Sequence, residues 1–226
     1  MAKSRKRSAS PPSRRLKPAE RERLILDEAK RYFSERGLNG GTEELAQRLG
    51  VTQPLLFRYF PTKIAMIERI FREIGASALD PGWVGRLADE SVPLEDRLVS
   101  FYSDYFDRVM TKENFRLCLY GDLAWSDSSH RYYGDMRRLI YPAIARAIRA
   151  SLPAGMRAKG RVTDMELEIV MTLHAIIYHL AVRKWVFSIP LKGKIRDLIR
   201  IKVAIFLRGV TAAASGHPLN SAVACR

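Results

Sequence analysis

The side chains best equipped to bind another molecule are gathered between residues 52 and 63. Arg58 can donate two parallel hydrogen bonds to a guanine edge or contact a phosphate, and Tyr59 can donate its hydroxyl to a phosphate. Pro54 and Leu55 offer apolar contact to the methyl group of thymine. This combination of donors and small apolar groups is typical of a surface that reads DNA.

Two short helices that meet at a tight turn would position these side chains. Residues 42–63 read TEELAQRLGVTQPLLFRYFPTK, in which Leu45, Ala46 and Leu49 form an apolar stripe that predicts a first helix. Gly50 stands where a left-handed backbone conformation is needed for the turn. The spacing predicts a helix-turn-helix, whose second helix enters the major groove while the first crosses the phosphate backbone.

The second helix is expected to begin after Thr52, whose hydroxyl caps it, with Pro54 in a first turn where a missing N–H costs nothing. Leu56 and Phe60 are expected to face inward. The side chains left to point mostly outward are Gln53, Leu55, Phe57, Arg58 and Tyr59. The same spacing also occurs in helical hairpins of ordinary all-α bundles, and the motif alone leaves this alternative open.

The flanking residues extend the pattern in both directions. Ile25, Ala29 and Phe33 lie in register on an upstream helix that ends at Gly37. With this spacing and no insertion, residues 23–71 resemble the DNA-binding domain of the tetracycline-repressor family of bacterial transcription regulators, and the run LAQRLGVTQP is close to the tetracycline repressors themselves. The rest of the chain is similar to the family only in length, helicity and order.

The resemblance implies roles for individual side chains. Gln53 matches a base-reading position that can bond bidentately to adenine, and Lys63 matches a lysine that meets a phosphate at the start of the fourth helix. Phe57 replaces a common tyrosine and is expected to be partly a packing residue. A glycine pair replaces the usual hydroxyl residues before the first helix of the motif, which leaves Thr42 to cap it. The expected DNA contacts are Thr42, Thr52, Gln53, Pro54, Leu55, Phe57, Arg58, Tyr59 and Lys63.

A basic excess favours a polyanionic partner, with nucleic acid as the first candidate. The 226 residues carry 39 Lys and Arg against 24 Asp and Glu, which gives a net charge of +15 and a pI near 10.2. Residues 1–17 hold basic and no acidic side chains, which predicts a disordered basic arm. This arm either follows the DNA backbone or minor groove, or is a solvated tail without a bound position.

The apolar pattern predicts an all-α fold of about nine helices. An amphipathic fourth helix, residues 63–76, carries Ile64, Ile67, Phe71 and Ile74 and is the expected connecting lever. Residues 77–92 are interpreted as a linker or an irregular turn. The predicted domains are the arm 1–17, a helix-turn-helix domain 18–76, a helical effector-binding and dimerisation domain 77–215, and a flexible tail 216–226.

The last two long helices, about 163–187 and 194–214, are apolar over more than one face, which indicates a second partner. Thr163 and Glu166 form a capping box that marks where the first of them begins. Members of the tetracycline-repressor family close a homodimer by packing such helices into a four-helix bundle. The resemblance therefore implies a homodimer through this pair.

A possible effector pocket is marked by aromatic and imidazole side chains. Tyr102, Tyr105, Trp125, His174 and Tyr178 could line a cavity in the second domain. The alternative is plain core packing, since large aromatic residues at helical spacing are usually core. We expect neither a metal site nor a cofactor, and no catalytic motif predicts an enzyme.

Nothing in the sequence predicts export or a membrane span. No uninterrupted apolar run approaches the roughly 20 residues that cross a bilayer, and the N-terminus lacks the apolar core of a signal peptide. Cys118 and Cys225 have neither metal-ligand nor disulfide spacing. We expect a cytoplasmic, homodimeric, ligand-responsive regulator, most simply a repressor, that binds a palindromic DNA operator and is released by a small-molecule effector. A non-specific or architectural DNA-binding protein without effector is the alternative.

Overall fold

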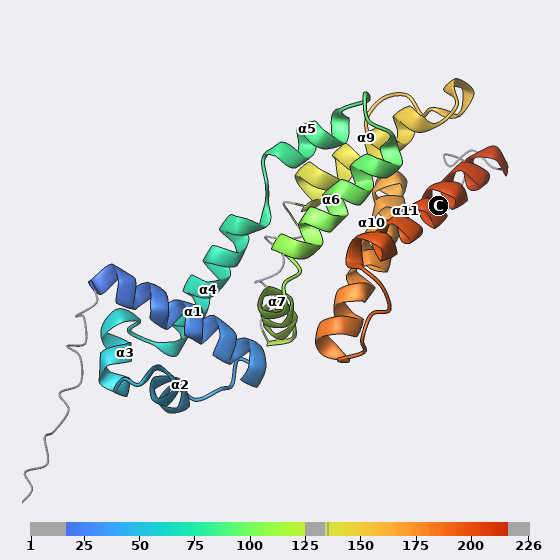
Figure 1. Ribbon diagram of the computed structural model, residues 1–226. Helices are drawn as coiled ribbons and strands as arrows, with labels where there is room; N and C mark the ends of the chain where they lie inside the picture. The colour runs from blue at the N-terminus through green and yellow to red at the C-terminus, as the bar shows by residue number, and fades with distance from the viewer. Residues whose placement is uncertain (1–16, 125–133, 135, 217–226) are drawn as a thin grey trace, which may run out of the picture.

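All regular elements of the part of the chain that the structure describes are helical. The computed structural model describes residues 17–124, 134 and 136–216, and the predicted all-α fold class is confirmed. Figure 1 shows a group of short helices at one end and a longer bundle at the other, joined by α4. The predicted basic arm up to residue 16, the predicted tail after residue 216, and Trp125 of the predicted pocket lie outside the described residues.

The first four helices share one apolar core. They are α1 (Pro18–Arg36), α2 (Thr42–Leu49), α3 (Gln53–Tyr59) and α4 (Lys63–Ala78). Helices α2 and α3, with 8 and 7 residues, are too short to be stable alone, so the burial of their apolar residues against α1 and α4 supplies most of their stability. The side chains buried at the centre of this core are Ile25, Leu26, Ala29, Tyr32, Phe33, Leu45, Leu56, Met66, Ile67 and Ile70.

The predicted turn between α2 and α3 is confirmed. Gly50 has φ 64° and ψ 31°, the left-handed conformation that a glycine adopts at least cost. Its backbone N–H donates to the carbonyl of Gln47 at 3.0 Å, and the N–H of Val51 donates to the carbonyl of Ala46 at 3.0 Å. Leu56 and Phe60 are buried, as the pattern predicted. The two helices therefore meet as a helix-turn-helix.

The two predicted caps of this motif are wrong in detail. Gly41 holds the N-cap position of α2, so Thr42 is the first helical residue and does not cap the helix. Thr52 is the N-cap residue of α3, but its hydroxyl accepts no capping hydrogen bond. The reason is local, because Pro54 has no N–H to give and the N–H of Leu55 donates to the main-chain carbonyl of Thr52 at 3.0 Å.

Of the two glycines before α2, only Gly40 lies where a side chain would clash. A Cβ atom on Gly40 would lie 2.7 Å from Cε1 of the Tyr32 ring, whereas a Cβ on Gly41 would meet nothing within 4 Å. The Tyr32 hydroxyl donates to Oε2 of Glu44 at 3.0 Å, and Nη2 of Arg36 donates to Oε1 of the same carboxylate at 2.8 Å. Glu44 thus ties α2 to α1, and Gly40 leaves room for the ring that carries this contact.

The predicted apolar stripe of α4 is confirmed at Ile67 and Ile74 but is wrong at Ile64. Ile64 is 59% exposed, whereas Met66, Ile67, Ile70 and Ile74 are buried. These four residues also follow three- and four-residue spacing, so the helical period alone did not decide which stripe faces the core. Thr62 caps α4 by accepting a hydrogen bond from the N–H of Ala65 at 3.0 Å.

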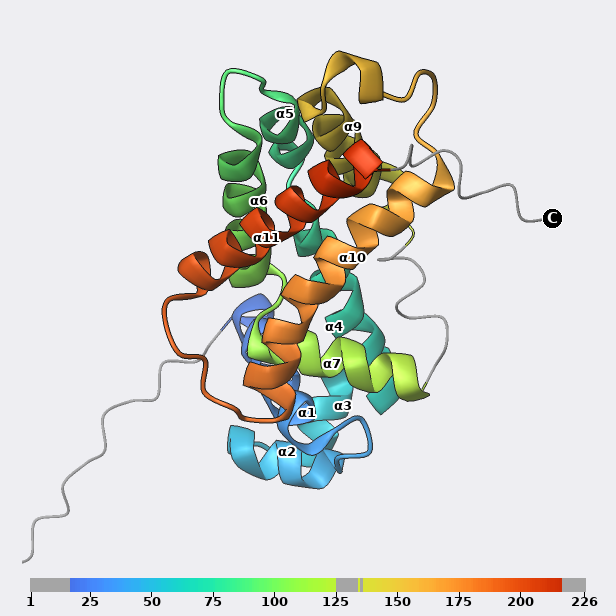
Figure 2. The ribbon, with the colours of Figure 1, turned by 90° about the vertical axis from the view of Figure 1, so that its right-hand side faces the viewer.

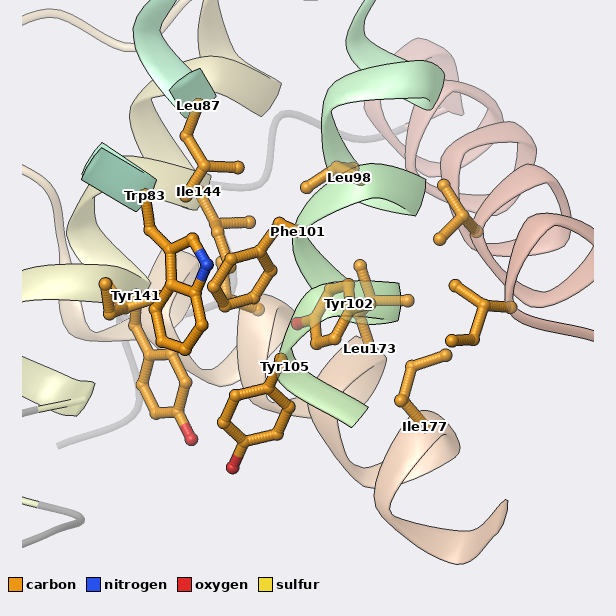
Figure 3. Packing of buried hydrophobic residues seen from close by; sticks show 14 of the residues in the cluster. Trp83, Leu87, Leu98, Phe101, Tyr102, Tyr105, Tyr141, Ile144, Leu173 and Ile177 are labelled. Atoms are coloured by element: carbon orange, nitrogen blue, oxygen red, sulfur yellow. The ribbon is translucent and has the colours of Figure 1, made fainter. Parts of the chain in front are cut away.

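The predicted linker after α4 contains a helix. Helix α5 (Gly82–Ala88) buries Trp83, which is 1% exposed and donates from Nε1 to Oδ2 of Asp104 at 2.6 Å. Its ring meets the ring of Phe101 edge to face with centroids 5.1 Å apart, as Figure 3 shows. Two glycines in seven residues weaken the helical signal, so tertiary packing rather than propensity holds this helix.

The remaining helices form the larger core. They are α6 (Leu94–Arg108), α7 (Lys112–Ala124), α9 (Tyr141–Ser151), α10 (Asp164–Ala181) and α11 (Ile195–Gly216), with π-helical turns at η1 (Met136–Ile140) and η3 (Val182–Val186) and a 3₁₀ turn at η2 (Ala154–Met156). The predicted capping box is confirmed, because the N–H of Thr163 donates to Oε2 of Glu166 at 2.8 Å and the N–H of Glu166 donates to the Thr163 hydroxyl at 3.3 Å. Pro142 lies in the first turn of α9, directly after η1.

We expect Gly40→Ala to destabilise the amino-terminal core by about 1–3 kcal/mol, because the added methyl overlaps the Tyr32 ring and strains the bond to Glu44. Urea unfolding followed by circular dichroism measures the change. The matched control is Gly41→Ala, whose methyl enters open space, so it loses only the N-cap preference for glycine and should destabilise the core less than Gly40→Ala. Equal effects of the two substitutions would contradict the steric explanation.

Candidate nucleic-acid interface

Helix α3 presents its amino-terminal residues and one arginine to solvent. Pro54 and Arg58 are exposed, and Gln53 and Leu55 are half-buried. Phe57 and Tyr59 are half-buried as well, and both pack against the amino-terminal core. Among the side chains predicted to contact DNA in this region, those of Thr52, Pro54 and Arg58 are therefore the most open to solvent.

Two of the predicted contact residues bind each other. The side-chain amide of Gln53 donates from Nε2 to the hydroxyl oxygen of Thr42 at 2.7 Å. This bond joins the first residue of α3 to the first residue of α2 across the turn. Sequence reasoning did not predict this pairing, because it joins residues of two different helices and depends on how those helices cross.

The acids of this region engage most of the nearby cations and leave Arg58 to the solvent. Arg48 pairs with Glu35 at 2.8 Å, Arg36 with Glu44 at 2.8 Å, and Arg23 with Glu73 at 3.1 Å. The hydrogen bond from Arg48 holds the pKa of the Glu35 carboxyl below its usual value. By contrast, no carboxylate within the described ranges pairs with the guanidinium of Arg58.

Lys63 stands at the start of α4, where the family lysine was expected. Its ammonium lies 5.7 Å from the centroid of the Phe33 ring, and partial burial lowers the pKa of Lys63 below its usual value. The ring of Phe33 is fully buried in the amino-terminal core, so it limits the positions that the lysine side chain can take. A cation held over a ring face is also attracted by the ring quadrupole.

The predicted effector residues only partly gather in one place. The imidazole of His174 lies among three phenol rings, with centroid distances of 6.2 Å to Tyr102, 5.4 Å to Tyr105 and 5.5 Å to Tyr141. The ring of Tyr178, one turn further along α10, lies 4.8 Å from that of Phe115. Sequence reasoning did not include Tyr141. It lies on α9, and residue spacing within one helix does not show which residues of α6 or α10 it contacts.

His174 is buried as a neutral base. The side chain lies in the large core, and desolvation lowers its pKa from 6.5 to about 4. Its Nδ1 atom is enclosed and makes no hydrogen bond within the part of the chain that the structure describes. Figure 3 shows the phenol hydroxyls of Tyr105 and Tyr141 pointing the same way.

A single arginine joins the amino-terminal helices to the larger core. Arg116 of α7 donates from Nε to the carbonyl of Ser34 at the end of α1, at 2.7 Å, and from Nη1 to the carbonyl of Trp185 in η3, at 3.2 Å. The same guanidinium donates to the Tyr120 hydroxyl at 2.6 Å. Figure 2 shows α7 lying across the region between α1 and α10. Leu117 of α7 is also buried in the amino-terminal core, so α7 contacts both groups of helices.

Comparison with known proteins agrees with this architecture. Residues 25–70 match the family model described as bacterial regulatory proteins, tetR family. A crystal structure of a candidate TetR-family transcriptional regulator from Mesorhizobium loti MAFF303099 is 12% identical, covers 86% of this chain and 98% of its own, and superposes with a TM-score of 0.54. For a tetR-family transcriptional regulator from Streptomyces coelicolor the identity is 20%, the coverage 91% and 87%, and the TM-score 0.58. No curated protein sequence matches the chain.

The structural likenesses show a shared fold, and the family model confirms the resemblance seen in the amino-terminal sequence. The matched segment runs from Ile25 in α1 to Ile70 in α4 and so includes the whole helix-turn-helix. Residues 25–70 are thus similar to the segment that this family model describes.

Protonation of His174 should make the larger core sensitive to acid. Its folded-state pKa lies below the unfolded value, so the unfolded chain takes up the proton first, and stability that is complete above about pH 6.5 is lost toward about pH 4. Between pH 7 and pH 5 we expect the free energy of unfolding to fall by about 2 kcal/mol more in the unchanged protein than in His174→Phe. Urea unfolding at the two pH values measures the difference.

The matched control for this experiment is His179→Phe, on the same helix but exposed. This change should leave the acid sensitivity as it is. Acid sensitivity that survives in His174→Phe would contradict the assignment to His174.

Proposed function

We propose that this chain is a homodimeric transcription regulator, acting as a repressor, that binds a palindromic DNA operator and is released from it by a small-molecule effector. The observation that carries the proposal is the helix-turn-helix with Gln53, Pro54 and Arg58 on the outer side of its second helix. The net charge of +15 adds general attraction to DNA phosphates.

The proposed dimer uses the outer faces of α10 and α11. One side of α11 is buried in the larger core through Ile199, Val203 and Phe206. On its other side Ile201 and Ile205 remain 57% and 65% exposed. In Figure 2 both helices lie on the face turned to the viewer, with no other element in front of them. Covering two exposed isoleucines on adjacent turns with the same surface of a second copy supports a two-fold dimer.

A dimer of this kind positions two recognition helices at once. Because the two subunits would be related by a two-fold axis, their α3 helices would meet half-sites of opposite orientation about one helical turn apart. A palindromic operator follows from the symmetry of the protein rather than from any single contact.

Effector release is proposed through the joint made by α7. A ligand that enters near His174 would displace α6, α9 or α10, the helices whose side chains surround the imidazole. Helix α10 continues into η3, whose Trp185 carbonyl accepts from Arg116, and Arg116 also holds the end of α1. A displacement of η3 would thus be transmitted to α1 through the two hydrogen bonds of Arg116. Helix α4 would provide a second connection. Effector and operator then share one coupling free energy.

The proposal includes a cytoplasmic location, and the one long apolar helix is consistent with it. The run Asp164–Val186 is, by length and composition alone, apolar enough to cross a membrane. A core helix of a soluble protein meets the same test, and α10 turns Leu167, Val170, Leu173 and Ile177 into the larger core. We assign its remaining apolar surface to the dimer contact.

For the DNA contact, we expect Arg58→Ala to lower affinity for the selected operator by about 1–3 kcal/mol, because an exposed guanidinium without a carboxylate partner is replaced by a methyl group. Fluorescence anisotropy with a labelled duplex at near-physiological salt measures the change. Arg161→Ala removes an exposed arginine from the loop before α10 and serves as the control, with no expected effect. Unchanged affinity in Arg58→Ala would contradict the recognition-helix assignment.

For the dimer, Ile205→Glu should raise the dissociation constant of the dimer by about a hundredfold, because an unpaired carboxylate would be buried between subunits. Sedimentation velocity over a range of protein concentrations measures it. Ile64→Glu alters an isoleucine of similar exposure on α4 and should leave the dimer intact. A dimer that tolerates Ile205→Glu and Ile201→Glu together would rule out this face.

A further inference from the structure

The hydrogen bond between Gln53 and Thr42 constrains the side chain best placed to read a base. Gln53 is the first residue of α3, the end of the recognition helix that meets base edges, and Pro54 behind it holds the backbone in helical conformation. Its Nε2 donates to the Thr42 hydroxyl oxygen at 2.7 Å. Thr42 is available for this contact because Gly41 occupies the N-cap position of α2.

This bond distinguishes the two ends of the Gln53 carboxamide. A glutamine amide has two N–H donors on nitrogen and one oxygen acceptor, and without a partner it can turn over so that the two ends exchange places. The Thr42 hydroxyl can accept or donate, and in the observed arrangement it accepts from Nε2. When it gives its own proton to another acceptor, it can bind Gln53 only as an acceptor, which holds the nitrogen of the amide toward α2. The second N–H and the carbonyl oxygen remain for an outside partner.

That remaining pair of groups matches one base. Adenine presents an acceptor at N7 beside a donor at N6 in the major groove, and a glutamine amide with one N–H and its oxygen side by side is complementary to both. Guanine presents two acceptors at the same place and leaves the glutamine oxygen opposed to O6. An amide of fixed polarity therefore discriminates between these two purines.

We propose that Thr42 is a positioning residue that fixes the carboxamide of Gln53 for the recognition of adenine. The inference rests on the proposed operator binding and adds a residue outside the recognition helix to its specificity. As an acceptor from Gln53, the Thr42 hydroxyl still has its own proton to donate, and a DNA phosphate beside α2 is an acceptor in reach of such a group. A threonine that served only the phosphate would act on all sequences alike.

The experiment separates these two roles. The full-length chain first selects duplexes from a random library, and dissociation constants are then measured for the selected duplex and for each single base-pair substitution in one half-site. The same set is measured for Thr42→Val, which keeps the shape and removes the hydroxyl, for Thr42→Ser, which retains it, for Gln53→Ala, and for the double variant. Thermal melting confirms that each variant is folded.

We expect Gln53→Ala to abolish a preference of about tenfold for A·T at one position of the half-site. Thr42→Val should reduce the preference at that same position, Thr42→Ser should retain it, and the double variant should match Gln53→Ala. The effects would then be non-additive, as expected for two residues that act as one unit.

Three results would overturn the proposal while leaving operator binding intact. These are a Thr42→Val variant that weakens all duplexes equally, one that loses preference at a different position, and a Gln53→Ala variant that keeps every base preference. If the unchanged protein selects no common sequence, the proposed function fails and this inference fails with it.

Discussion

The close approach of the Tyr32 ring to the backbone at Gly40 sets where the helix-turn-helix lies on α1. The ring fits only because residue 40 has no side chain, and its hydroxyl then reaches the carboxylate of Glu44 on α2. Arg36 binds the other oxygen of that carboxylate, so α2 is tied to α1 at two points of one group. Since α2 carries Thr42, and Thr42 binds the side chain of Gln53, the orientation of the Gln53 carboxamide depends on a contact inside the protein.

The same end of α1 also meets the larger core. The Ser34 carbonyl, two residues after Tyr32, accepts a hydrogen bond from Arg116, whose guanidinium also binds the backbone of η3. Carbonyls in the last turn of a helix lack partners within the helix, so a guanidinium supplied by another element satisfies one of them. The carboxy-terminal end of α1 is therefore hydrogen-bonded both to α2 and to α7. Any displacement of α7 relative to α1 has to break or shift these bonds, which makes the joint a physical basis for coupling between the two cores.

Helical periodicity was enough to predict most of the chain. Helices α1, α2 and α3, the glycine turn, the capping box at Thr163, and the two long carboxy-terminal helices follow from stripes, caps and turn residues close in sequence. The helix α5 was missed because glycines weaken its local signal while the burial of Trp83 holds it in place. Ile64 was assigned to the core because two overlapping stripes on α4 satisfy the same period, and only the neighbouring helices select between them.

The sequence by itself determined the fold class, the helix-turn-helix and the resemblance to the tetR family, because these depend on residue types at short fixed spacings. Only the tertiary structure decided that Thr42 binds Gln53, that the Tyr141 ring lies against His174, and that Arg116 links α1 to η3. These contacts join residues from different helices. The order of residues along one helix fixes which face each side chain occupies, but the partner that this face meets is set by how all the helices pack together.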